Sequence, residues 1–115
     1  MKMKELFDRG EFVVSAEVGP PKGIHVDELV EEAKTYLKGV HAVNVTDNQS
    51  SVMRLGSLAM CKVLKDAGMD PIFQLACRDR NRIALESDLL SAAMLGIENI
   101  LCLTGDHTKM GDHPQ

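Results

Sequence analysis

Apolar positions along the chain change their spacing in a regular way. Short runs dominated by apolar and β-branched residues predict four strands, at Phe12–Val18, His41–Thr46, Pro71–Cys77 and Ile97–Leu103. We expect the first of them to be buried on both faces. Between these runs the apolar residues recur at helical spacing, which predicts amphipathic helices, and a shorter helix over residues 3–9 precedes the first strand. The predicted order is therefore an opening helix, then strands alternating with helices.

Each of the three longer predicted helices has an apolar stripe. The stripes are Val26, Leu29, Val30, Ala33 and Leu37; Val52, Leu55, Ala59, Val63, Leu64 and Ala67; and Ile83, Ala84, Leu90, Ala93 and Met94. Ser50 or Ser51 is the expected N-cap of the second helix, and Asp79 that of the third. A glycine recurs every 28 or 29 residues, at Gly10, Gly39, Gly68 and Gly96, where each is expected to end a helix in the left-handed conformation.

This alternation requires parallel strands joined by right-handed crossovers. Two architectures fit, an open doubly wound sheet and a (β/α)8 TIM barrel. Neither GxGxxG nor GxxxxGK[ST] occurs in the chain, although an open sheet usually carries such a phosphate loop. A barrel needs about 200 residues or more, so 115 residues supply about half of one. We predict a single domain over 1–115 that forms the first half of a TIM barrel, with an open parallel α/β sheet as the alternative.

Composition narrows the classes of function. A net charge of −4, no run of Lys or Arg, and few aromatic residues argue against a nucleic-acid-binding protein. No apolar stretch approaches the length of a membrane-spanning helix, and the amino terminus is too polar for a signal peptide. Cys61, Cys77 and Cys102 form no CxxC pair, so we expect reduced, structural cysteines in a cytoplasmic protein, with a reactive or metal-binding thiolate at Cys77 as the less favoured alternative. The histidines have no metal-binding spacing, so no metal site is predicted.

Candidate chemistry lies at the carboxyl ends of the four predicted strands. The residues there are Glu17; Thr46, Asp47 and Asn48; Gln74 and Cys77; and Thr104 and Asp106. Strand ends converge in a barrel, so this set can line one pocket. Two carboxylates in one pocket can divide acid and base roles, and the neutral polar residues suit a heterocyclic ligand. Taken alone, Glu17 is more simply a solvated strand-end residue, and Asp106 is equally well explained as a turn residue after Gly105.

Four motifs in order resemble the methylenetetrahydrofolate reductase family, in its bacterial short form. Residues 15–21, SAEVGPP, match the family's E-x-x-P-P, and VNVT at 43–46 matches its V-x-V-T. FQLAC at 73–77 corresponds to H-L-T-C, and LTGD at 103–106 to L-R-G-D. The resemblance covers nearly the whole chain, which would be the amino-terminal part of a family domain of roughly twice its length or more.

The resemblance implies a flavin-dependent barrel that reduces 5,10-methylenetetrahydrofolate to 5-methyltetrahydrofolate in one-carbon metabolism and methionine biosynthesis. Glu17 would be the general acid that helps open the folate ring, provided that burial raises its pKa. Asp106 would lie near flavin and pterin, with a catalytic and a cofactor-binding role. Thr46, Gln74, Thr104 and Gly105 occupy positions that contact the flavin in the family. FAD is expected rather than FMN, with NAD(P)H as a possible electron donor.

Three departures from the family pattern qualify these expectations. Val18-Gly19 replaces a bulkier pair, Gln74 stands where many relatives have histidine, and Thr104 where many have arginine. Such departures resemble anaerobe-type reductases that take electrons from a partner subunit. A pterin-binding barrel methyltransferase and a non-catalytic half-barrel that binds a ligand or a partner remain as alternatives. Because a half-barrel leaves strand edges and an apolar face uncovered, we expect the 115-residue chain to oligomerise and to be inactive by itself.

Overall fold

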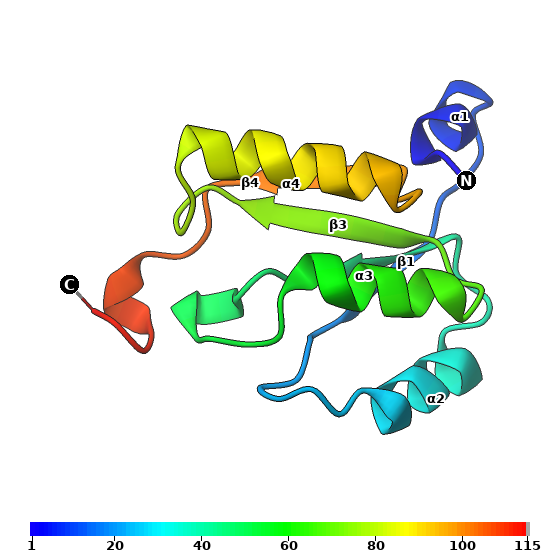
Figure 1. The fold of residues 1–115 in the computed structure, drawn as a ribbon. Coiled ribbons are helices and arrows are strands. Elements are labelled where there is room, and N and C mark those ends of the chain that lie inside the picture. The colour runs from blue at the N-terminus through cyan, green and yellow to red at the C-terminus, as the bar shows by residue number, and fades with distance from the viewer. Residues whose placement is uncertain (115) are drawn as a thin grey trace.

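The computed structural model describes residues 1–114, which form one four-stranded sheet with helices between the strands (Figure 1). The helices are α1 (Met3–Asp8), α2 (Asp27–Tyr36), α3 (Ser57–Asp66) and α4 (Arg82–Met94). The strands are β1 (Ser15–Val18), β2 (Ala42–Val45), β3 (Pro71–Ala76) and β4 (Asn99–Leu103). Two short 3₁₀ turns, η1 (Gln49–Ser51) and η2 (Thr108–Met110), lie in the segments that follow β2 and β4.

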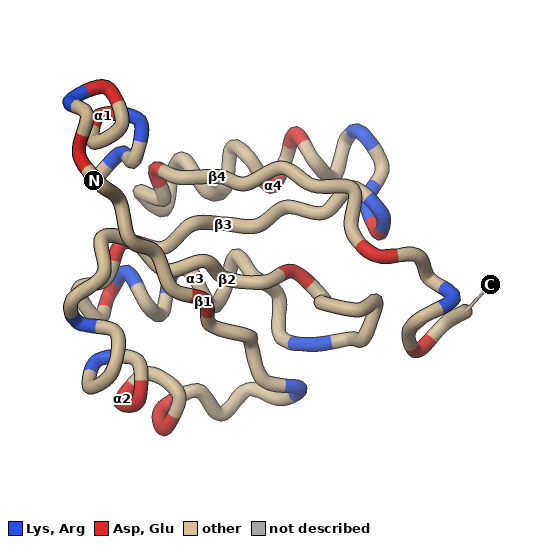
Figure 2. The backbone as a smooth tube through the Cα atoms, turned by 180° about the vertical axis from the view of Figure 1, so that it is seen from behind, with Lys and Arg blue, Asp and Glu red and all other residues tan. Residues whose placement is uncertain are grey.

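The strands are all parallel and follow one another in the order β1-β2-β3-β4. Helices α2, α3 and α4 lie on the same side of the sheet, and the view from behind shows the strands in front of them (Figures 1 and 2). A doubly wound sheet reverses its strand order and carries helices on both faces. This arrangement therefore matches the first half of a (β/α)8 barrel, as predicted, and not the open-sheet alternative.

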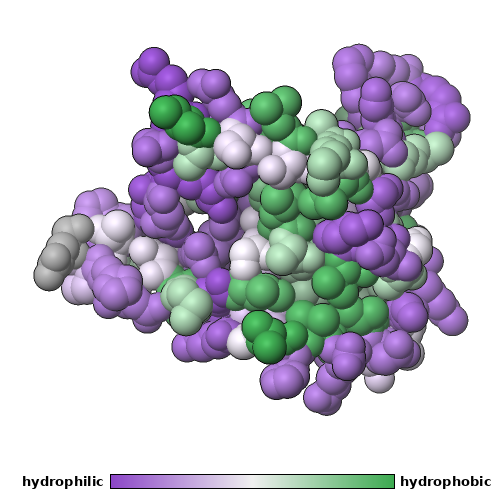
Figure 3. All heavy atoms as spheres, viewed as in Figure 1, coloured by the Kyte–Doolittle hydropathy of each residue, from purple (hydrophilic) through white to green (hydrophobic). Residues whose placement is uncertain are grey.

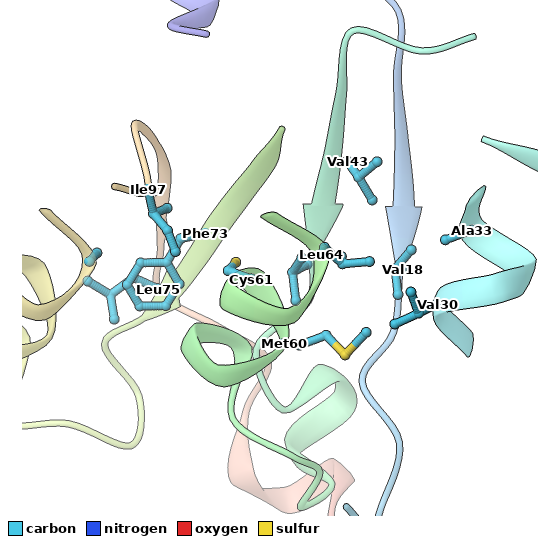
Figure 4. Packing of buried hydrophobic residues seen from close by; sticks show 12 residues of the cluster. Val18, Val30, Ala33, Val43, Met60, Cys61, Leu64, Phe73, Leu75 and Ile97 are labelled. Atoms are coloured by element: carbon cyan, nitrogen blue, oxygen red, sulfur yellow. The ribbon is translucent and has the colours of Figure 1, made fainter. Parts of the chain in front are cut away.

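The core lies between the sheet and its helices (Figure 4). Val18, Val45 and Phe73 are register partners on adjacent strands, and all three belong to the core cluster. They pack with Val30 and Ala33 of α2, Met60, Cys61 and Leu64 of α3, and Ala92 of α4. Because side chains alternate along a strand, the intervening residues point to the opposite face. That face, here called the open face, carries Ser15, Glu17, Asn44, Ile72, Gln74, Asn99 and Leu101.

The first strand is shorter and more exposed than predicted. It begins at Ser15, and Phe12 is 88% exposed. Ser15 and Glu17 are exposed, whereas Val18 is buried against α2. The expectation of burial on both faces was wrong because β1 is an edge strand, and Ser15 and Glu17 on its open face are exposed. Burial on both faces instead occurs in β3, where all six residues are buried.

Helix starts also differ from the sequence-based expectations. Ser50 and Ser51 have φ near +59°, which cannot continue a right-handed helix, so α3 begins only at Ser57, after Gly56. Helix α4 is capped by Asn81, whose Oδ1 accepts a hydrogen bond from the Ala84 N–H at 2.9 Å. Asp79 is not the cap, because its carboxylate binds the neighbouring Arg78 instead.

Three of the four periodic glycines end their helices as predicted. Gly10, Gly68 and Gly96 have φ between +72° and +90°. Gly39 does not have a positive φ, and the connection from α2 to β2 turns without it. The repeat of helix, glycine and strand is therefore present in the structure, but at Gly39 the helix ends without a left-handed glycine.

The cysteines divide into one buried and two exposed residues. All three are free. Cys61, a residue of α3, is fully buried, as predicted for a structural cysteine, whereas Cys77 and Cys102 are exposed. The apolar runs around Cys77 and Cys102 suggested that both would be buried. Cys102 is exposed because it lies in β4, the other edge strand of the sheet, and Cys77 lies just beyond the end of β3.

Cys61 is expected to resist thiol reagents in the native protein. Burial raises the pKa of its thiol from 9.0 to about 12, so the reactive thiolate is scarce at pH 8. A thiol-reagent titration should label Cys77 and Cys102 quickly and Cys61 only on unfolding. Since the folded pKa is the higher one, this burial contributes stability below pH 9 that is lost as the pH rises toward 12. Rapid native labelling that persists in a Cys77→Ala, Cys102→Ala variant would contradict the prediction.

Apolar side chains also remain exposed on the helical side. Figure 3 shows them gathered in a band over the helices. On α4 the most exposed are Ile83, Leu90 and Met94, each at least 75% exposed. Charged residues lie mainly on the helices and loops and leave the strands nearly free of charge (Figure 2). No helix formed by residues 1–114 is long and apolar enough to cross a membrane.

Candidate functional site

A cleft of about 320 Å³ opens at the carboxyl ends of the strands, on the open face. It is lined by Glu17, Thr46, Asp47, Gln49, Gln74, Arg78, Leu103, Thr104, Gly105 and Asp106. All six residues that the sequence nominated for catalysis or cofactor binding, Glu17, Thr46, Gln74, Thr104, Gly105 and Asp106, are in this set. Residues up to 89 positions apart are therefore brought together because parallel strands end at the same edge.

A polar ladder crosses the open face below the cleft. The Gln74 Nε2 donates to Asn44 Oδ1 at 3.2 Å, and the Asn44 Nδ2 donates to Ser15 Oγ at 3.4 Å. Gln74 is only 9% exposed, so its amide is held in place by a neighbouring strand rather than by water. This fixes the orientation in which Gln74 would meet a ligand in the cleft.

Thr46 is the clearest sign that the cleft is built for a ligand. The residue is 4% exposed, and its Oγ1 is buried without a hydrogen-bond partner among the described residues. A buried hydroxyl without a partner is costly and uncommon in native proteins. Thr46 lines the cleft together with Gln74, and its buried hydroxyl lies near Gly19, 3.7 Å from where a Cβ of that residue would be. A polar group that reaches this atom would satisfy it.

The two candidate carboxylates have different surroundings. Glu17 is exposed at the end of β1, and the described residues do not provide the burial expected of a general acid. Asp106 follows β4, and its Oδ2 accepts a hydrogen bond from the Ser50 N–H at 3.0 Å. Asp106 is therefore held by the η1 segment, whereas no hydrogen bond or ion pair among the described residues holds the Glu17 carboxylate.

Sequence reasoning missed Arg78, which lies just beyond β3. Its side chain is 8% exposed and pairs with Asp79, and the hydrogen bonds between them raise the pKa of Arg78 and lower that of Asp79. It also donates to the backbone oxygens of Asn48 and Asp106, both at 3.1 Å. The segments after β2, β3 and β4 are thus tied together by one guanidinium. Arg78 alternates with Arg80 and Arg82 in a predicted loop, and nothing in this local sequence indicated which arginine would connect the strand ends.

A second set of polar contacts, centred on Asp47 and Arg80, connects the strands near the cleft. The side chain of Asp47 is fully buried, and its Oδ2 accepts the Ala76 N–H at 2.8 Å and binds the Arg80 guanidinium. Arg80 also donates to Asp88 on α4 at 2.8 Å. Asp47 was noted in sequence only as a strand-end polar residue, whereas its contacts in the structure are those of a structural anchor.

Gly105 must be a glycine for the cleft to keep its shape. Its φ is +84°, and a Cβ at this position would lie 2.9 Å from Arg78 Nη1 and 3.3 Å from the Ala76 Cβ. Two residues from the predicted strand ends lie outside the cleft. Asn48 borders a neighbouring hollow with Arg78, and Cys77 is exposed beyond β3. Within residues 1–114 no group of three or more His, Cys, Asp or Glu could hold a metal ion.

The segment after β4 is hydrogen-bonded to η1 and to the residues just after it. Asp112 N–H donates to Ser51 O at 3.1 Å, and Met53 N–H donates to Asp112 Oδ2 at 2.7 Å. Gly111 permits this contact, because a Cβ there would lie 1.9 Å from Ser51 O. The same segment includes Asp106, so its docking also helps to position one candidate site residue.

Replacing Gly111 by alanine is therefore expected to release this segment. Overpacking usually costs about 1–3 kcal/mol, and here the cost falls on local docking and not on the core. Limited proteolysis should cleave after β4 more readily than in the wild type, with a small fall in Tm. Gly23→Ala is the control, since no atom lies within 4 Å of a Cβ there. Equal proteolysis of the two variants would show that the close contact is unimportant.

The chain was compared with known proteins and with models of protein families. A search of curated proteins finds no match. The family model described as methylenetetrahydrofolate reductase matches residues 2–115, nearly the entire chain. The four motifs at the strand ends, the barrel-type sheet order and this match agree. The chain belongs to the methylenetetrahydrofolate reductase family.

Proposed function

We propose that the cleft is the flavin and folate site of a reductase that converts 5,10-methylenetetrahydrofolate to 5-methyltetrahydrofolate. The observation that carries this proposal is the meeting of Glu17, Thr46, Gln74 and the 104–106 segment in one cleft, in a chain of this family. The cleft combines neutral hydrogen-bonding groups with the charged residues Glu17, Asp47, Arg78 and Asp106. Polar groups placed in this way fix the orientation of a bound ligand.

The residues present fit a flavin. The isoalloxazine ring offers several acceptors and a ring N–H along one edge, and the buried Thr46 hydroxyl and the fixed Gln74 amide could bind them. Thr104 and Gly105 would contact the ring or its substituents from the end of β4. When bound and reduced, the flavin supplies the hydride for the reaction. We propose FAD in preference to FMN.

Glu17 is the proposed proton donor. A protonated Glu17 carboxyl would donate to the folate nitrogen that leaves when the five-membered ring opens. Because Glu17 is exposed, this role requires that bound folate and flavin exclude water from its carboxyl group. Asp106 lies in the same cleft with its carboxylate held by Ser50, and we propose that its negative charge favours cationic character in the folate.

The electron source and assembly are also proposals. NAD(P)H is the proposed donor, with an electron-transfer partner subunit as the alternative. The exposed residues of α4, and the exposed Ser15, Glu17 and Leu101 on the open face, support oligomerisation or further chain against these surfaces. For the same reason we expect the 115-residue chain alone to show no folate turnover.

The visible absorption spectrum of the full-length protein tests the proposal. We expect flavin bands, and release followed by chromatography would distinguish FAD from FMN. Bleaching of the bands by NADH or NADPH, and their return on adding methylenetetrahydrofolate and not tetrahydrofolate, would support the reaction. A colourless protein that takes up no added flavin would overturn it.

A further inference from the structure

Arg78 has donor capacity that the protein does not use. A guanidinium carries five N–H groups. The Nε donates to Asp79 Oδ1, the Nη2 to Asp79 Oδ2 and Asn48 O, and the Nη1 to Asp106 O. One N–H on Nη1 therefore has no acceptor among the described residues, on a side chain that is 8% exposed.

That nitrogen belongs to the wall of the cleft. Arg78 lines the cleft with Thr46 and Gln74, and its Nη1 lies beside Gly105, 2.9 Å from where a Cβ would be. Arg78 is also the only Lys or Arg among the described residues that line it. Two residues of the cleft lining thus have hydrogen-bonding capacity that the described residues do not use, Arg78 at its Nη1 and Thr46 at its hydroxyl.

The hydrogen bonds that Arg78 already makes restrict the kind of acceptor group that it can bind in a ligand. Arginine recognises phosphates and carboxylates best with two parallel N–H groups. In Arg78 that pair, Nε and Nη2, is occupied by the two oxygens of Asp79. The remaining Nη1 hydrogen suits a single acceptor such as a carbonyl oxygen or a ring nitrogen, as on the pyrimidine edge of a flavin.

We propose that Arg78 binds an acceptor on the flavin ring and, through its charge, favours the reduced flavin over the oxidised one. This inference rests on the proposed function. Charge near the flavin ring nitrogens is one of the means by which a protein tunes this cofactor. The exposed Asp106 carboxylate lies in the same cleft and acts in the opposite direction, so the two residues together set the potential.

The test measures flavin affinity and the midpoint potential in the full-length protein. Arg78→Gln removes the charge, and the preference for reduced over oxidised flavin should fall about tenfold, which is about 30 mV for a two-electron couple. Arg78→Lys keeps the charge and should restore most of the potential, even if the lost bracing lowers Tm. Arg54→Gln is the matched control, since Arg54 donates to the Pro20 oxygen at 3.4 Å and does not line the cleft.

A second variant covers the case in which Arg78→Gln fails to fold. Asp79→Asn keeps Arg78 and removes the charge of its counter-ion, so the preference for reduced flavin should rise. If flavin binds but its potential is the same in all of these variants, the inference is wrong while the proposed function stands. Weaker binding at unchanged potential would also overturn it, because it would place Arg78 on the flavin phosphate. A wild-type protein without flavin would instead defeat the proposed function.

Discussion

Replacing Glu17 by glutamine is expected to slow folate reduction by about 10²–10⁴-fold, the usual contribution of a general acid. Glutamine keeps the size and the hydrogen-bonding ability of the side chain but cannot deliver a proton to the leaving nitrogen. Because Glu17 is exposed at the end of β1 and has little to hold in the fold, its loss should leave stability nearly unchanged.

The two half-reactions separate this role from cofactor binding. Stopped-flow measurements on the full-length protein should find flavin reduction by its electron donor at the wild-type rate. Reoxidation of the flavin by methylenetetrahydrofolate should be the slow step. Glu86→Gln, a change of the same kind on the outer helix α4, is the control. Reoxidation within about threefold of the wild type would remove Glu17 from the proton-transfer role.

The sheet and the convergence of the site could be predicted from sequence for a simple reason. Apolar spacing distinguishes buried strands from amphipathic helices, and their alternation leaves only parallel architectures. Once the strands are parallel, the residues after them must meet at one edge. Glu17 and Asp106 were therefore placed in the same cleft without knowledge of any contact between them.

What the sequence could not reveal depends on contacts between distant loops. Asp79 is of a residue type that often caps helices, but its carboxylate binds Arg78, and Asn81 caps α4 instead. The left-handed conformation of Ser50 and Ser51 has no local glycine signal and occurs where the segment after β4 packs against them. The burial of β1 was misjudged because its sequence does not reveal that it lies at an edge.

Replacing Asp47 by alanine should have the largest effect on stability of any change near the cleft. The variant leaves the mostly buried Arg80 guanidinium without its main partner, and the Ala76 N–H without an acceptor. Removing one member of a buried ion pair typically costs about 3–5 kcal/mol. The loss should also weaken the attachment of α4 to the sheet, since Arg80 connects Asp47 to Asp88 in the middle of that helix.

Asp88→Ala provides the matched control, because it removes the other carboxylate on the same arginine. Asp88 is 34% exposed, so its pair with Arg80 is partly solvated and should contribute about 1 kcal/mol or less. Urea unfolding of flavin-free protein, followed by circular dichroism, would compare the two free energies at equal slope. A larger loss for Asp47→Ala would identify the buried carboxylate as the anchor between β2, β3 and α4. Equal losses would mean that water reaches Arg80 readily and that the cleft wall is held mainly by Arg78.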